Sequence, residues 1–125
     1  METALTITEL LTLDAHSLQK RLEARTLTSV ELVDSCLAQI ESHDRNGVQL
    51  RAITAIAPLD KLRERAQQLD NDRASGHVKS SLHGIPILVK DCIATSPRYG
   101  LKTSVGSLAL KDSFPRKTSK VVDKV

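Results

Sequence analysis

Residues 82–91 read LHGIPILVKD and carry the clearest structural signal in this chain. The glycine favours a turn, and Pro86 stands near the start of the apolar run, where its missing N–H removes no central ladder bond. The run over residues 85–89 has no polar alternation, which is typical of a strand covered on both faces. We therefore predict a buried strand that ends in a charged pair, Lys90 and Asp91. Most lysines at strand ends only mark the exit into solvent.

Three helices are predicted before this strand. Residues 14–24 begin with an aspartate that can cap the helix, and leucines recur along one face. Residues 28–40 begin with a capping box of Thr28 and Glu31, in which each side chain satisfies the other residue's backbone N–H. A third helix over residues 58–71 starts with a proline, which suits the first turn.

The remaining pattern predicts an α/β fold. Residues 51–57 are rich in isoleucine and alanine and are closed by a proline, which favours a second strand. Residues 71–81 are polar and form a loop, while Thr118 or Ser119 can cap a last helix that stops within its second turn. The predicted helices and the short second strand are too few to cover both faces of the buried strand. We therefore expect a larger fold, and we expect the isolated chain to fold poorly.

The composition is that of a globular protein. The 125 residues are 40% hydrophobic and 26% charged, with one Tyr, one Phe and no Trp, so the core must consist of aliphatic side chains. The net charge of +3 resides after residue 110, where five basic residues stand against two acidic ones. This tail has no nucleic-acid motif and only Phe114 as a stacking ring, so no nucleic-acid partner is expected.

Several site classes and locations find no support in the sequence. Cys92 and Cys36 form no C-x-x-C pair, and Cys36 recurs on the apolar face of the 28–40 helix as a small core residue. The four histidines lack ligand spacing, so neither a metal nor a cofactor is expected. No basic residue precedes Lys20, and no apolar run is long enough to span a membrane. A cytoplasmic chain without a membrane partner is predicted.

Three further motifs accompany LHGIPILVKD in a recognisable order. Residues 28–32 read TSVEL, residues 50–58 contain the second predicted strand, and residues 100–107 read GLKTSVGS, followed by LAL. This arrangement resembles the amidase-signature family over nearly the whole chain. The resemblance implies the N-terminal helices and first strands of a mixed β-sheet, incomplete in this chain. We expect residues 1–80 to be mainly helical, 81–110 to form the lysine strand and its loop, and 111–125 to form a basic tail with a truncated helix.

The resemblance also implies a chemistry. Lys90 matches the family's catalytic lysine, which exchanges a proton with two serines while a serine nucleophile attacks an amide and forms an acyl-enzyme. A neutral amine is required, and we expect burial at the strand end to favour it. The serines lie in a Gly/Ser-rich segment beyond residue 125. The implied activity is hydrolysis of carbon–nitrogen bonds in a small-molecule amide, with residues 1–125 inactive alone.

The neighbours of Lys90 receive supporting roles. Ser104 and Ser107 match the family's supporting loop, and we expect their hydroxyls to bond to the backbone. Asp91 is expected to hold the turn after the lysine, and Cys92 to be a packed thiol. The family favours glycine where this chain has Arg25, and if that position needs a positive φ, arginine costs about 1 kcal/mol.

Two alternatives remain open. The chain can be a non-catalytic binding or regulatory domain that kept the lysine strand without the chemistry. It can also be part of the A-type component of an aminoacyl-tRNA amidotransferase. The substrate amide and the oligomeric state cannot be read from the sequence.

Overall fold

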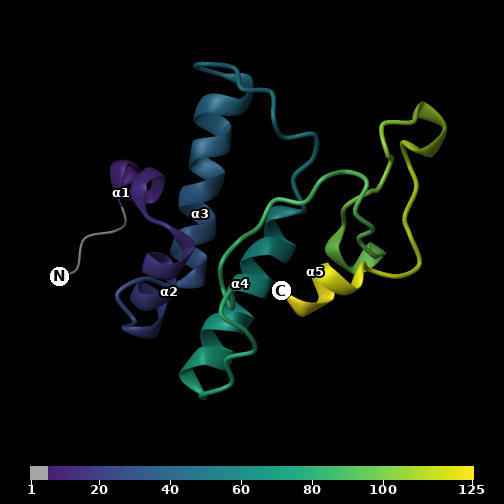
Figure 1. Cartoon of the computed structure of the whole chain (residues 1–125). Coiled ribbons are helices and arrows are strands. Elements are labelled where there is room, and N and C mark those ends of the chain that lie inside the picture. Colours follow the sequence, from purple (N-terminus) through teal and green to yellow (C-terminus); the bar gives the residue numbers. More distant parts are fainter. Residues whose placement is uncertain (1–5) are drawn as a thin grey trace.

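The computed structural model describes residues 6–125 and shows a mainly helical molecule (Figure 1). Its α-helices are α1 (Ile7–Thr12), α2 (Ala15–Glu23), α3 (Ser29–Ile40), α4 (Leu59–Ala74) and α5 (Lys120–Lys124). A π-helical turn, η1 (Glu41–Arg45), extends α3, and 3-10 turns lie at η2 (Pro97–Tyr99) and η3 (Leu108–Leu110). The two long helices α3 and α4 pack side by side, and the loops after residue 90 lie away from α1 and α2.

Local sequence signals fix the ends of α2 and α3 as predicted. The Asp14 carboxylate accepts the Ser17 N–H at 2.8 Å, so it caps α2. The capping box of Thr28 and Glu31 is formed in full at the start of α3. Each cap satisfies N–H groups that the helix cannot bond internally.

The end of α2 forces one residue into a left-handed conformation. Arg25 has φ 59°, and its N–H donates to the Leu22 carbonyl at 3.2 Å. The Thr26 N–H donates to the Arg21 carbonyl at 3.0 Å, which completes a Schellman motif. The position therefore does need a positive φ, and the steric strain of a side chain there costs about 1 kcal/mol.

The core is small and aliphatic. Leu18 and Leu22 of α2 pack with Leu27 and with Leu32 of α3, and the last is fully buried. Cys36 lies partly buried against this cluster, and burial raises the pKa of its thiol. The prediction that Cys36 is a packed core residue is confirmed.

A carboxylate from α4 caps the start of α3. Asp70 accepts the N–H of Ser29 at 2.7 Å and the N–H of Val30 at 3.3 Å. Farther along the same pair of helices, Arg63 of α4 forms an ion pair with Asp34 of α3 at 2.9 Å. These contacts tie α3 to α4 at two points, and the Asp70 contact also satisfies the free donors at a helix N-terminus.

Gly84 lies directly against this capped helix start. Ser29 is completely buried, and a Cβ atom on Gly84 would lie 2.2 Å from the Ser29 Oγ. Gly84 also has φ +85°, which side chains rarely adopt. Only glycine fits here, because both the space and the backbone conformation exclude a side chain.

The buried His83 binds the segment that contains Gly84 to α4 through hydrogen bonds. Its Nε2 bonds to the Leu69 carbonyl at 2.9 Å, and its Nδ1 accepts the Lys79 N–H at 3.2 Å. An acceptor role for Nδ1 assigns the ring proton to Nε2. Arg73 of α4 donates to the His83 carbonyl at 2.6 Å. The chain therefore leaves α4 in a fixed direction, and His83 orders this loop.

The two predicted strands do not form among residues 6–125, which contain no strand. In the 51–57 segment, the N–H groups of Ala52 and Ile53 donate to the Asp44 carboxylate at 2.7 and 3.0 Å instead of to another strand. The 85–89 segment has no ladder partner, and Leu88 is 78% exposed. A strand requires a neighbour, and the described residues supply none.

The helix boundaries depart from prediction at two places. The short helix α1 was not predicted, although Thr6 and Glu9 form a capping box there. The predicted 58–71 helix begins one residue later and ends three residues later than expected, since α4 runs from Leu59 to Ala74 with Pro58 as its N-cap. The last helix begins after Ser119, one of the two predicted caps, but the Ser119 side chain makes no capping hydrogen bond.

We predict that Gly84→Ala opens the α3–α4 contact far more than Gly76→Ala does. Both glycines have positive φ, but a Cβ on Gly76 meets nothing within 4 Å. Gly76→Ala should therefore cost only the conformational strain of about 1 kcal/mol, while Gly84→Ala adds overpacking of about 1–3 kcal/mol. The hydrogen-exchange rates of the α3 and α4 amides measure the effect of each substitution. Equal effects of the two substitutions would contradict the close contact with Ser29.

Candidate active site

Lys90 lies at the end of the 85–89 segment, and its side chain is exposed. Its carbonyl accepts the Ile93 N–H at 2.9 Å, which forms a tight turn immediately after the lysine. Within residues 6–125 its ammonium makes no ion pair and no hydrogen bond. The burial expected at Lys90 is therefore not observed, because no second layer covers the segment that carries it.

The carboxylate of Asp91 is bound by the loop over residues 104–106. Oδ1 accepts the Ser104 N–H at 3.0 Å, while Oδ2 accepts the Ser104 hydroxyl and, at 3.5 Å, the Gly106 N–H. The Val105 N–H donates to the Asp91 carbonyl at 3.4 Å. The Ser104 hydroxyl, aided by the backbone donors, holds the pKa of Asp91 below its ordinary value.

The same loop has an unusual backbone. Val105 has φ 55° and Gly106 has φ 72°, so two successive residues are left-handed. They form the centre of a turn closed by the Ser107 N–H on the Ser104 carbonyl, and the N–H groups of Ser104 and Gly106 reach the Asp91 carboxylate. The loop is held from its other side, where the Thr103 N–H donates to the Ser113 carbonyl at 3.0 Å.

The segment after Lys90 is held to the C-terminal residues by two hydrogen bonds and an ion pair. The Ser119 N–H donates to the Ala94 carbonyl at 2.8 Å, and the Ser96 N–H donates to the Thr118 hydroxyl at 3.0 Å. Arg98 forms an ion pair with Asp123 of α5. These contacts place the start of α5 beside the turn that follows the lysine.

The structure brings some predicted neighbours of Lys90 together and separates others. Ser104 and Asp91 meet, and the bond from the Ser104 hydroxyl goes to a carboxylate instead of to the backbone. Ser107 joins the loop through its N–H, which donates to the Ser104 carbonyl at 2.9 Å. Cys92 is exposed, so the prediction of a packed thiol there is wrong. It lies two residues after the exposed Lys90, in a turn that the described residues leave open to solvent.

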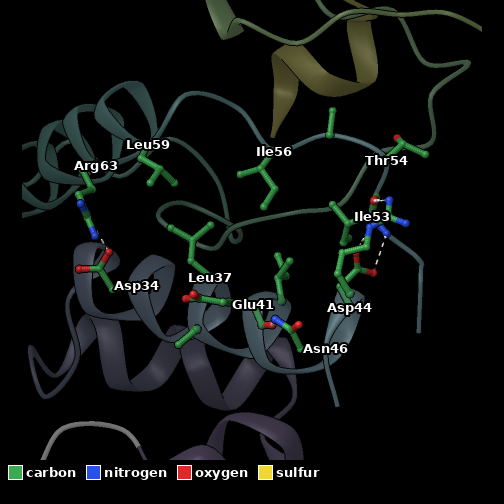
Figure 2. Close-up of a pocket in the computed structure, with 14 residues that line it drawn as sticks. Asp34, Leu37, Glu41, Asp44, Asn46, Ile53, Thr54, Ile56, Leu59 and Arg63 are labelled. Carbon is green, nitrogen blue, oxygen red and sulfur yellow. Dashed lines mark hydrogen bonds and ion pairs between the residues drawn. The ribbon is translucent and has the colours of Figure 1, made fainter. Parts of the chain in front are cut away.

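A groove of about 840 Å³ opens between α3, η1 and the 53–59 segment (Figure 2). Leu37 points toward Ile56 and Leu59 across its apolar floor. The charged groups at its rim include the Asp34–Arg63 pair and Asp44, whose carboxylate binds backbone N–H groups. Neither Lys90 nor its neighbours line this groove. The groove is therefore separate from the lysine and its loop.

Within residues 6–125, no group of three or more potential ligand side chains is arranged to hold a metal ion. No helix in the same range is long and apolar enough to cross a membrane.

Comparisons with family models, curated proteins and solved structures all point to the same family. A family model described as Amidase matches residues 31–125. The A subunit of glutamyl-tRNA(Gln) amidotransferase from Chloroflexus aggregans is 34% identical over 119 residues, which are 95% of this chain and 23% of that protein. The native peptide amidase from Stenotrophomonas maltophilia has a TM-score of 0.80 at 38% identity, covering 90% of this chain and 22% of its own. An amidase family protein from Bacillus anthracis str. Ames has a TM-score of 0.82 at 34% identity, covering 94% of this chain and 22% of its own.

The overall layout of the chain is thus shared with amidase-type proteins. The chain belongs to the Amidase family, as the resemblance of its motifs predicts. It spans 22–23% of the length of these relatives.

We predict that the Asp91 contacts persist to unusually low pH. The ionised carboxylate makes these contacts, and its pKa is lowered, so they hold above the ordinary carboxyl pKa of about 3.9 and are lost as pH falls through the lower folded-state value. In NMR spectra, the amide protons of Ser104 and Gly106 should move only at this lower pH. Asp91→Asn should abolish the step. A step in the ordinary carboxyl range would contradict the prediction.

Proposed function

We propose that this chain supplies Lys90 as the proton-transfer group of an amidase that hydrolyses carbon–nitrogen bonds through an acyl-serine intermediate. The observation that carries the proposal is the intact LHGIPILVKD segment of an Amidase family member, in which Lys90 forms no ion pair among residues 6–125. An ammonium cannot accept a proton, so an amine held in a stable ion pair would suit the role poorly.

The proposed reaction balances in two stages. A serine oxygen adds to the amide carbonyl, its proton passes to the Lys90 amine, and the same proton leaves with the departing amine. Water then adds to the acyl-serine carbonyl, the bond to the serine oxygen breaks, and a water proton returns to that oxygen through the Lys90 amine as the carboxylic acid leaves. By resemblance both serines come from outside residues 1–125, and packing around them would cover the exposed Lys90.

A second candidate function is that of the A component of a glutamyl-tRNA amidotransferase. The relatives from Chloroflexus and Anaeromyxobacter carry that name at 33–34% identity. In this case the amide would be a source of ammonia, and the protein would act with partner proteins. The similarity to peptide amidase, at 38% identity, favours the first candidate. Lys90 would have the same role in both.

Residues 1–125 alone should show no amidase activity. The lysine is present without the serine nucleophile, so no acyl-enzyme can form. The purified chain is assayed against short aliphatic and aromatic amides, with Lys90→Ala as the reference. Turnover above buffer that disappears in Lys90→Ala would show that a nucleophile lies within these residues.

A chimera tests the role of Lys90 directly. Residues 1–125 replace the matching segment of the Stenotrophomonas maltophilia peptide amidase, so that the chimera has the full length of that enzyme. Lys90→Arg should lower kcat/KM by about 10²- to 10⁴-fold, as Lys90→Ala does, because arginine stays protonated at working pH. Lys102→Arg is the matched control, since Lys102 is exposed and its one ion pair among residues 6–125 is with Asp112.

Circular dichroism verifies that each chimera folds. If Lys90→Arg keeps most of the activity, Lys90 is a surface charge at the end of a segment. The regulatory-domain alternative would then gain support.

A further inference from the structure

We propose that Asp91 is a positioning residue for Lys90: it locks the 104–106 loop against the turn that carries the lysine. The inference rests on the proposed catalytic role of Lys90. It concerns contacts between residues 13 to 15 positions apart, which the sequence motifs do not reveal.

The first support is the number and direction of the donors. Both oxygens of Asp91 are used, one by the Ser104 N–H and the other by the Ser104 hydroxyl and the Gly106 N–H. The Asp91 carbonyl takes the Val105 N–H as well. Four donors from three consecutive residues converge on one residue, so the loop has a single way to dock.

The second support is the strain in the loop. A β-branched side chain at φ 55° is disfavoured, yet Val105 adopts that conformation next to the left-handed Gly106. A concavity of backbone N–H groups is stable when an anion fills it. The Asp91 carboxylate accepts the Ser104 and Gly106 N–H groups, while the Ser107 N–H closes the turn on the Ser104 carbonyl; removing the charge should therefore loosen the Val105–Gly106 turn.

The third support is the effect of the Asp91 contacts on Lys90. Asp91 follows the lysine directly and is the nearest acid in the chain. Because the loop uses both of its oxygens, the carboxylate forms no ion pair with the Lys90 ammonium. The loop and the lysine turn become one rigid unit, and the lysine side chain stays free.

The experiment uses the same full-length chimera and compares Asp91→Asn with Asp112→Asn. Asp112 lies in the same region and its carboxylate pairs only with Lys102 among the described residues. Asp91→Asn should lower kcat by about 10²-fold, the cost of a displacement near 1 Å, with KM changed little. Asp112→Asn should leave both unchanged. Exchange of the Ser104 and Gly106 amides should speed up in Asp91→Asn, while α3 and α4 keep their protection.

The outcomes separate the inference from the proposed function. If Lys90→Arg abolishes activity and Asp91→Asn keeps wild-type kcat, the inference is overturned and the function stands. If Lys90→Arg is active, the proposed function is wrong, and the inference that rests on it is wrong as well. Where Asp91→Asn does not fold, Ser104→Ala removes only the hydroxyl donor and should still lower kcat about tenfold. An unchanged kcat in that variant would overturn the inference.

Discussion

The contact between Gly84 and Ser29 fixes the rest of this structure. Ser29 is completely buried at the start of α3, and the backbone of Gly84 occupies the space where a side chain would collide with it. Asp70 and Arg73 reach the same place from α4, one capping α3 and the other holding the His83 carbonyl. The direction in which the chain runs toward Lys90 is therefore set some residues earlier, at the meeting of two helices.

This arrangement explains why the family motifs are spread along the chain. The TSVEL segment supplies the helix cap and the small buried serine, and the LHG segment supplies the ring and the glycine that pack against them. Among the described residues, neither segment forms a hydrogen bond or an ion pair with the Lys90 side chain. Their residue types are demanded by close packing, because a larger side chain at either position would push the lysine segment off the helix pair.

Local signals predicted the helices better than the rest. The Thr28–Glu31 box and the Asp14 cap each depend on residues three apart, so they can be read directly from the sequence. The strand over 85–89 depended on neighbours that the described residues do not contain, and its apolar run alone could not show this. The Asp91–Ser104 contact joins residues 13 apart through a left-handed loop, which only the folded backbone reveals.

The left-handed Arg25 also affects the unfolded chain. An arginine restricts the backbone of the unfolded state more than a glycine does, which is worth about 0.4–1 kcal/mol to the folded state. This gain offsets only part of the strain of about 1 kcal/mol at φ 59°. The Schellman hydrogen bonds at Arg25 and Thr26 form with either residue, since they use only backbone groups. Arginine at this position therefore still destabilises the folded state on balance, and the turn between α2 and α3 forms in spite of that cost.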